Sequence, residues 1–333
     1  MIETLLSNFW VVLVLKILVV ALMIPLIGMA IGFAEMKLSA KMQARVGPYF
    51  AGGRWGWAQL IADGVKFFQK EDIIPADADR PVFKTAPIWV LVGTVALFVV
   101  IPFGPGLVFR DLSVGIFYAL AISSLSTIGV LMAGWSSANK YSLMGGLRAA
   151  GQLIAYELPL VLAVVGVVIM AGTMSLSAIV EAQITAGYPY VVFQFVGFGI
   201  FLIATLAELT RIPFDMPIAE SELVMGYVTE YSGFRFLFFF LAEFANMFTM
   251  SAIAVTLFLG GYWLPGVPVD MLDYLGPVIL LAKVFILVFA MIWFRWTFPR
   301  FREDQLQSLA WKWLIPLSLA NIVATAAAKV FLS

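Results

Sequence analysis

Long apolar stretches, separated by short polar segments, dominate the chain. Most of the stretches are about 20 residues long, which is the length that a helix needs to cross the hydrocarbon core of a bilayer. The pattern predicts eight transmembrane helices, at 10–34, 86–102, 113–135, 150–171, 189–209, 236–260, 274–297 and 306–331. We therefore expect an all-α polytopic membrane protein, with a single integral membrane domain over residues 1–333.

Basic residues concentrate in alternate loops of this predicted topology. The first loop, at 35–85, holds eight of the 20 Lys and Arg residues, whereas the second loop holds only Arg110. The positive-inside rule therefore places the odd-numbered loops in the cytoplasm and both termini on the outer side. The chain opens Met1-Ile2-Glu3, without the basic segment of a signal peptide, so we expect the first apolar segment to be a retained span.

The first loop also contains a segment with apolar residues at helical spacing. The pattern predicts an amphipathic helix at the cytoplasmic membrane interface. A surface helix that only anchors the loop would have the same pattern. Two long cytoplasmic loops further suggest that partners dock from that side. The apolar face comprises Trp57, Leu60, Ile61, Gly64, Val65 and Phe68, and the polar face comprises Gln59, Asp63, Lys66 and Lys70.

Composition excludes several function classes. With 62% hydrophobic and 12% charged residues, the chain is not a soluble single-domain enzyme. It has no Cys and no His, so it cannot ligate an iron–sulfur cluster, and haem and zinc lose their usual ligands. A net charge of zero gives no indication of a nucleic-acid partner. Proton chemistry must use carboxylates, lysines, tyrosines, backbone groups and water.

Several carboxylates fall inside predicted spans, where an ionised side chain costs about 2.5 kcal/mol or more on insertion scales. Glu157 lies in the fourth span, Glu208 ends the fifth and Glu243 lies in the sixth, while Glu35 closes the first. No basic residue lies within one helical turn of Glu157. A buried carboxyl without a fixed partner can exchange protons near neutral pH, as a proton relay requires. Buried ion pairs or positions near the lipid headgroups are the alternative, particularly for Glu35 and Glu208.

The loop at 210–235 is unusually polar yet interleaved with apolar residues. We expect it to fold back against the membrane domain and line a cavity. If it were helical, Glu208, Arg211 and Asp215 would share a face, and Arg211 would bridge the two carboxylates. Two prolines would end such a helix early. The charged residues at and within this loop are Glu208, Arg211, Asp215, Glu220, Glu222, Glu230 and Arg235.

The segment Arg211-Ile-Pro-Phe-Asp-Met-Pro-Ile-Ala-Glu-Ser-Glu-Leu223 closely resembles the signature loop of the H-subunit family of respiratory complex I, the proton-pumping NADH:quinone oxidoreductase. The resemblance covers nearly the whole chain, in order. It includes the segments 70–72, 134–143, 148–158, 226–233, 259–262 and 295–305. Membrane subunits of energy-converting hydrogenases share parts of the pattern.

The resemblance implies a subunit of the prokaryotic plasma (inner) membrane that forms most of a quinone chamber. Quinone is then a substrate, and this chain holds no permanent cofactor. FMN and iron–sulfur clusters are expected on partner subunits. The implied partners are cluster-bearing peripheral-arm subunits on the cytoplasmic side and small membrane subunits leading to antiporter-like subunits, together with quinone and membrane lipid.

The resemblance also implies roles for particular residues. A proton or charge relay is implied for Glu35, Glu157, Glu208, Glu220, Glu222 and Glu243. The quinone chamber or its supporting ion pairs are implied for Lys37, Arg45, Asp63, Arg211, Phe214, Asp215, Glu230 and Arg295. The chain departs from the family pattern at Ile218 and Ser124, where relatives often have Glu, and in the first loop at Met36 and at Gly47-Pro48-Tyr49-Phe50.

Other functions remain open from the sequence. One is the equivalent subunit of an energy-converting hydrogenase or of a ferredoxin- or deazaflavin-dependent relative, because the electron donor would bind another polypeptide. A stand-alone proton-coupled transporter could use the same glutamates, although the chain shows no internal repeat. A third possibility is a purely structural anchor, in which Glu157, Glu208 and Glu243 could all be replaced without loss of function.

Overall fold

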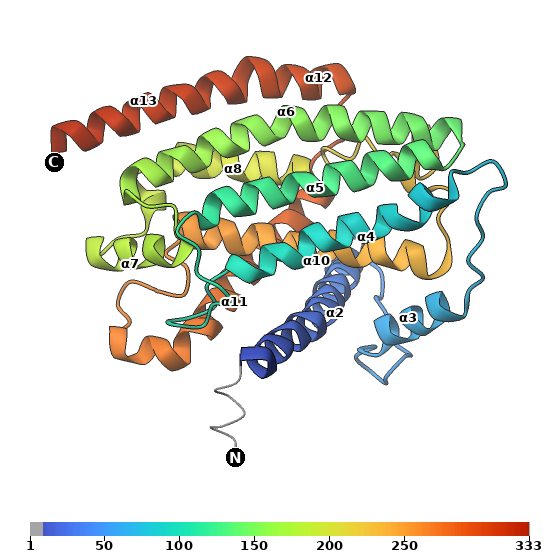
Figure 1. The fold of residues 1–333 in the computed structure, drawn as a ribbon, viewed down its shortest axis with the longest axis horizontal. Helices are drawn as coiled ribbons and strands as arrows, with labels where there is room; N and C mark the ends of the chain where they lie inside the picture. The colour runs from blue at the N-terminus through green and yellow to red at the C-terminus, as the bar shows by residue number, and fades with distance from the viewer. Residues whose placement is uncertain (1–8, 333) are drawn as a thin grey trace.

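The computed structural model describes residues 9–332, and this part of the chain is all-helical apart from one isolated bridge between Gly104 and Leu107 (Figure 1). The all-α prediction is therefore confirmed for these residues. The expectations about the first residues and the two termini concern residues 1–8 and 333, which lie outside the described residues.

The helices are labelled as in Figure 1, with η marking short 3-10 segments and, at η5, a π-helical one. They are α2 (Phe9–Met42), α3 (Gln59–Gln69), α4 (Arg80–Leu97), η1 (Phe98–Val100), α5 (Gly115–Ser136), α6 (Lys140–Ala171), α7 (Leu176–Ala186), η2 (Tyr190–Val192), α8 (Phe195–Glu208), α9 (Glu220–Leu223), η3 (Gly226–Val228), α10 (Gly233–Phe258), η4 (Val269–Met271), α11 (Leu272–Thr297), α12 (Glu303–Leu309), η5 (Ala310–Leu314) and α13 (Ile315–Leu332).

Among the described residues, seven helical segments are long and apolar enough to span a membrane, one fewer than predicted. The difference lies at 189–209, where the structure has η2 and then α8. A 14-residue helix is about 21 Å long, short of a hydrocarbon core of about 30 Å. The interruption coincides with Gln194, whose amide is used in contacts to the last helix.

Three helices extend beyond their predicted ends. The first, α2, continues to Met42, so Glu35 lies inside it rather than at its end. The helix α4 begins at Arg80 with a proline in its first turn, where the missing N–H costs nothing. The helix α6 begins at Lys140, because the side chain of Asn139 accepts a hydrogen bond from Tyr141 N at 2.8 Å and caps it. The first loop therefore spans 43–79, not 35–85.

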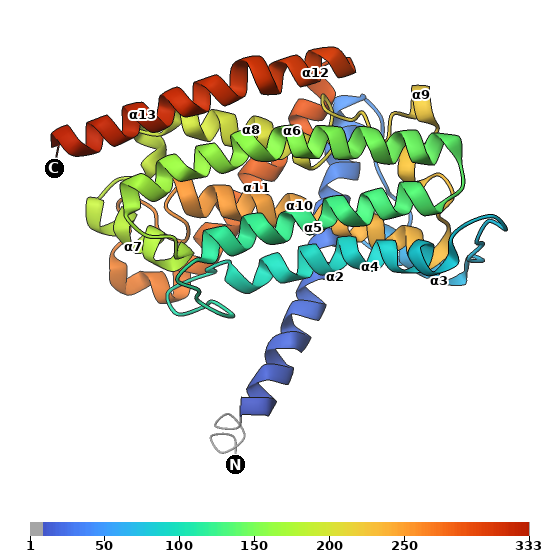
Figure 2. The ribbon, with the colours of Figure 1, turned by 45° about the horizontal axis from the view of Figure 1, so that its top comes forward.

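The long helices form a bundle with α10 at its centre. α13, α6, α5 and α4 lie successively against one another and run roughly alongside one another in both views (Figures 1 and 2). α10 packs on α4, α2 and α11, and is the most buried of the candidate spans. The N-terminal half of α2 projects away from the bundle (Figure 2). Its exposed side chains, including Trp10, Val14 and Ile17, form an apolar surface suited to lipid.

The polar loop between α8 and α10 is folded into the bundle rather than extended into solvent. Phe214, Met216, Leu223 and Val228 are buried, as is Tyr231, whose ring stacks on Phe83 of α4 at a centroid distance of 4.0 Å. Apolar residues between the charges thus anchor the loop. The charged side chains are thereby held at fixed positions against the surrounding helices.

Candidate functional site

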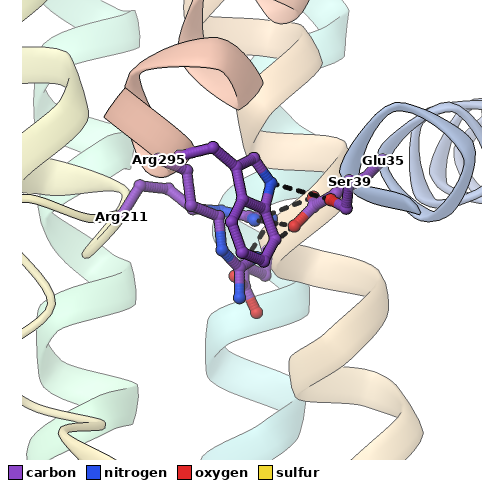
Figure 3. Close-up of polar contacts among 6 residues, drawn as sticks. Glu35, Ser39, Arg211 and Arg295 are labelled. Atoms are coloured by element: carbon purple, nitrogen blue, oxygen red, sulfur yellow. Dashed lines mark hydrogen bonds and ion pairs between the residues drawn. The ribbon is translucent and has the colours of Figure 1, made fainter. Parts of the chain in front are cut away.

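A cluster of charged side chains joins α2, the loop after α8, and α11. The Glu35 carboxylate of α2 accepts hydrogen bonds from Arg211 Nη1 at 2.8 Å and also from Arg295 Nη1 of α11 (Figure 3). Arg211 and Glu35 are both buried, with 5% and 7% of their surfaces exposed. Hydrogen bonds between guanidinium groups and a carboxylate are charge-assisted and stronger than neutral ones.

Glu243 of α10 completes the cluster from the opposite side of Arg211. Its Oε1 lies 3.0 Å from Arg211 Nη2, and the Arg211 guanidinium stands over the Phe244 ring, 5.0 Å from its centroid. Burial alone would lower the pKa of Arg211, but Glu243 and Glu35 outweigh it and raise that pKa. The guanidinium therefore stays charged. Two cations and two anions balance in a site that α2, α10 and α11 enclose.

Arg211 does not bridge Glu208 and Asp215, as it would if residues 208–215 were helical. α8 ends at Glu208, and Thr210 has a left-handed backbone with φ 50°, so residues 208–215 do not continue a helix. Helical spacing is lost, and Arg211 is directed to Glu35 and Glu243 instead. Next to the cluster, Trp296 Nε1 donates to Ser39 Oγ at 2.8 Å and ties α11 to α2 (Figure 3).

Asp215 pairs with an arginine that the sequence pattern did not single out. Arg300 Nη2 lies 2.9 Å from Asp215 Oδ2, and Arg300 Nη1 donates to Ser221 Oγ at 3.2 Å. Burial raises the pKa of the Asp215 carboxyl to about 6, although Arg300 and Arg295 lower it. Asp215 thus titrates close to neutral pH, and Arg295 acts on both this carboxyl and Glu35.

Arg148 of α6 links the polar loop to α12. Its Nη1 lies 2.6 Å from Glu222 Oε2, and its Nε lies 3.7 Å from Glu303 Oε2. Glu222 and Glu303 are exposed, so these pairs contribute little stability on their own. Glu220, two residues before Glu222, is exposed and in the described structure forms no ion pair.

Glu208, a predicted relay residue, is partly buried at the end of α8. It lines two small cavities, of about 20 and 50 Å³, and its Oε2 has no hydrogen-bond partner among the described residues. The larger cavity is also lined by Glu243, and the smaller by Ser123 of α5. Both volumes are large enough for a water molecule, and the polar walls offer it partners. Glu157 of α6 lies close enough to Glu208 for their charges to interact.

Gln152 of α6 fixes both ends of the turn that contains Arg211. Its Nε2 donates to Ala207 O and to Phe214 O, each at 2.7 Å, and the residue is 1% exposed. Ala207 immediately precedes Glu208, so one amide positions both the enclosed carboxyl and the polar loop. Sequence reasoning missed Gln152, because an amide in an apolar helix gives no sign of which backbone it reaches.

The structure also contains an apolar crevice of about 1170 Å³. Its walls come from α2, α3, α4 and α10 and from the segment before α5. On α2 the lining extends from Val12 to Met29, and Met29 lies six residues before Glu35, about 9 Å along the helix. On α10 the lining reaches Leu241, two residues before Glu243. On both helices the crevice lining ends within two helical turns of the charged cluster, and none of the four cluster residues lines the crevice.

The remaining predicted site residues lie apart from the cluster. Lys37 donates to Pro48 O, Arg45 donates to Gln43 Oε1 at 2.7 Å, and Asp63 on α3 pairs with Lys66 at 2.9 Å. The Phe214 ring is buried, 5.3 Å from the Tyr156 ring and 5.4 Å from the Phe301 ring, and so packs in the core. Glu230 accepts a hydrogen bond from the α6 cap, Asn139.

Within residues 9–332, no group of three or more acidic side chains is arranged to hold a metal ion. The chain as a whole has neither Cys nor His. Its candidate site is therefore built from arginines, carboxylates and an apolar crevice.

Comparison with known proteins identifies the family. The model of the family described as NADH dehydrogenase matches residues 15–326. The H subunit of NADH-quinone oxidoreductase from Bacillus cytotoxicus is 48% identical over 324 residues, which cover 97% of this chain and 95% of the relative. The H subunit from Bacillus thuringiensis subsp. konkukian is 47% identical over 336 residues, with 99% of each chain covered. With seven long apolar helices among the described residues and these relatives, the chain is a multi-pass membrane protein. It belongs to the NADH dehydrogenase family, which includes the H subunits of bacterial NADH-quinone oxidoreductases.

Proposed function

We propose that this chain is the H subunit of a complex I-type oxidoreductase, that it forms the chamber in which quinone is reduced, and that it couples this reduction to proton translocation. The observation that carries the proposal is an apolar crevice whose lining on α2 and α10 ends within two helical turns of Glu35 and Glu243, the carboxylates that contact Arg211. A quinone has a long apolar tail and a headgroup with two carbonyl oxygens. The crevice matches the tail, and guanidinium groups beyond its end match the headgroup.

The electrons have to come from a partner subunit. Reduction of a quinone to the quinol consumes two electrons and two protons. With no Cys and no His, this chain has no ligands for an iron–sulfur cluster, so we assign the clusters to partner subunits, together with the FMN expected for this type of enzyme. The role of this chain is to hold the quinone, exclude water and supply the electrostatic surroundings.

The charge relay follows the enclosed carboxylates. Reduction places negative charge near Glu35 and Arg211, and that charge disturbs the balance of the cluster. Glu243 touches both the cluster and the larger cavity, and Glu208 lines both cavities. The order Glu243, Glu208, Glu157 thus forms a path into the bundle. Glu222, which pairs with Arg148, and the exposed Glu220 lie at the cytoplasmic surface of this path.

The topology completes the proposal. We assign the eighth crossing to η2 together with α8, which span residues 190–208 with one interruption. The odd-numbered loops, with most of the basic residues, face the cytoplasm, and both termini face outwards. α3 lies at the cytoplasmic interface, because Ile61, Val65 and Phe68 are exposed on its apolar face.

The test is purification of the intact complex from native membranes, followed by an assay of quinone reduction with NADH, reduced ferredoxin and reduced deazaflavin. The expected result is co-purification with cluster-bearing and antiporter-like subunits and inhibitor-sensitive quinone reduction driven by NADH. Activity only with ferredoxin or deazaflavin would assign the chain to a relative with another donor. A chain that purifies alone and moves solute in liposomes would overturn the proposal.

A matched pair of variants tests the site itself. Replacing Arg295 by Gln removes a guanidinium that contacts Glu35. Replacing Arg54 by Gln is the control, because Arg54 is an exposed cation of the first loop outside the charged cluster. The account expects a raised KM for quinone in the first variant only. Equal KM values for quinone in the two variants would show that the cluster does not contribute to quinone binding.

A further inference from the structure

The apolar crevice carries a charge pattern that quinone binding does not use. Among the described residues that line it, only Lys16 and Arg110 are charged, and both are cations. All the others are apolar or glycine. Quinone is uncharged and its headgroup is assigned to the other end, near Glu35. Two cations in an apolar wall therefore need a different explanation.

Both cations lie at the end of the crevice that is remote from α3. Lys16 Nζ donates to Phe109 O at 2.6 Å, which places the ammonium group beside Arg110. Lys16 is two helical turns from the start of the described part of α2, and Arg110 lies in the segment between η1 and α5. Both side chains are exposed, and neither forms an ion pair with any residue that the structure describes.

The nearest carboxylate in the chain does not neutralise them by direct contact. Asp111 follows Arg110, but its Oδ1 accepts a hydrogen bond from Ser175 Oγ at 2.9 Å at the start of α7. Arg110 N donates to Val99 O at 3.1 Å, which fixes the backbone at this point. The two cationic groups are therefore held at one end of the crevice and lack an anionic partner among residues 9–332.

The crevice is long enough for a lipid chain at this end and a quinone tail at the other. On α2 its lining extends from Val12 to Met29, a rise of about 26 Å, whereas one acyl chain reaches across a single leaflet, about 15 Å. We propose that Lys16 and Arg110 bind the phosphate of an anionic bilayer phospholipid, such as phosphatidylglycerol or cardiolipin, whose acyl chain lies in the crevice.

Charge favours an anionic phospholipid over a zwitterionic one. A phosphate diester accepts hydrogen bonds from both cations, and a headgroup without its own ammonium leaves a net negative charge to balance them. A small soluble anion would bind the two cations but leave the apolar side chains next to Lys16, namely Val12, Leu13 and Ile17, uncovered. The proposal uses the crevice of the proposed function but concerns its opposite end.

The experiment uses the intact complex in nanodiscs and a photoactivatable phosphatidylglycerol with the reactive group on its acyl chain. Labelled peptides are mapped by mass spectrometry, with unlabelled phosphatidylglycerol or phosphatidylcholine as competitor. We expect labelling within residues 12–29, and competition by phosphatidylglycerol only. Replacing Lys16 and Arg110 together by Gln should reduce the labelling at least tenfold, because each basic residue near an anionic membrane surface strengthens binding about fivefold.

Two further variants control this result. The exchange Lys16→Arg with Arg110→Lys keeps both charges and should restore labelling. Lys140→Gln removes an exposed cation at the start of α6 and should leave labelling unchanged. Equal labelling of the double Gln variant, equal competition by phosphatidylcholine, or a partner helix cross-linked into the crevice would each overturn the lipid site. Inhibitor-sensitive quinone reduction by the same preparation reports separately on the proposed function.

Discussion

Replacing Arg211 by Gln removes the cation that two carboxylates share. In the native chain, Arg211 contacts Glu35 at 2.8 Å and Glu243 at 3.0 Å while it is 5% exposed. The variant leaves Glu35 with Arg295 alone and leaves Glu243 without an ion-pair partner among the described residues. Contact with the Phe244 ring is also lost. A buried site with balanced charge becomes one with a net negative charge.

The expected cost follows from this arrangement. Breaking a buried ion pair by removal of one partner costs about 3–5 kcal/mol, because the other charge stays buried and uncompensated. Arg295 still compensates Glu35, so we expect the lower end, about 3 kcal/mol. The double variant Arg211→Gln with Glu243→Gln restores charge balance at one of the two carboxylates. It should therefore lose less than the two single variants together, with a coupling of about 1 kcal/mol or more.

The assay is thermal inactivation of the purified complex, followed by quinone reductase activity and by retention of this subunit. A cost of about 3 kcal/mol corresponds to a drop of about 5 °C in the inactivation midpoint for a chain of this size. Arg302→Gln is the matched control, because Arg302 pairs only with the exposed Asp304, and it should leave the midpoint unchanged. The reasoning is refuted if Arg211→Gln behaves like this control or if the double variant shows simple additivity.

Three further predictions test other parts of the structure. Asp215→Asn tests the raised pKa of about 6, against the usual 3.8. The folded protein holds the Asp215 proton more tightly than the unfolded chain, so the protonated carboxyl stabilises the fold fully below about pH 4, and this stabilisation is lost as pH rises through 6. The melting temperature of the native complex, relative to that of the variant, should therefore fall over that range. A difference that does not change with pH would contradict this prediction. Gly197→Ala would place Cβ 2.8 Å from Gln194 Oε1 and should cost about 1–3 kcal/mol in thermal melting, whereas Gly199→Ala, with nothing within 4 Å, should be neutral or slightly stabilising. Glu157→Gln should assemble and reduce quinone but translocate fewer protons per quinone in proteoliposomes, and an unchanged ratio would remove Glu157 from the relay.

The helices were largely predictable from sequence because burial in lipid requires long apolar runs. Their ends were less so. The start of α6 depends on the Asn139 cap, and the start of α4 on a proline in its first turn, and hydropathy reports neither. The span predicted at 189–209 contains Gln194, whose amide bonds Asn321 and Thr325 of α13. Only the folded chain shows that this polar residue interrupts the helix.

The carboxylates of the candidate site could be selected from sequence, because an ionisable group in an apolar helix is costly unless it has a partner or a use. Their partners could not. Arg211 and Glu35 are separated by 176 residues, and Arg295 and Glu35 by 260. Local helical spacing suggested other partners for Arg211, and it failed where α8 ended. The long-range pairs, the two cavities and the Gln152 contacts all depend on tertiary packing.

The most direct test of the central claim is photolabelling of the intact complex with a quinone analogue that carries a reactive group near its headgroup. The account predicts that the label attaches to this chain, at peptides of α2, α10 and the loop that contains Arg211. It also predicts that excess quinone prevents the labelling and that Arg295→Gln weakens it. Labelling confined to partner subunits, or labelling of this chain that excess quinone leaves unchanged, would contradict the assignment of the quinone chamber.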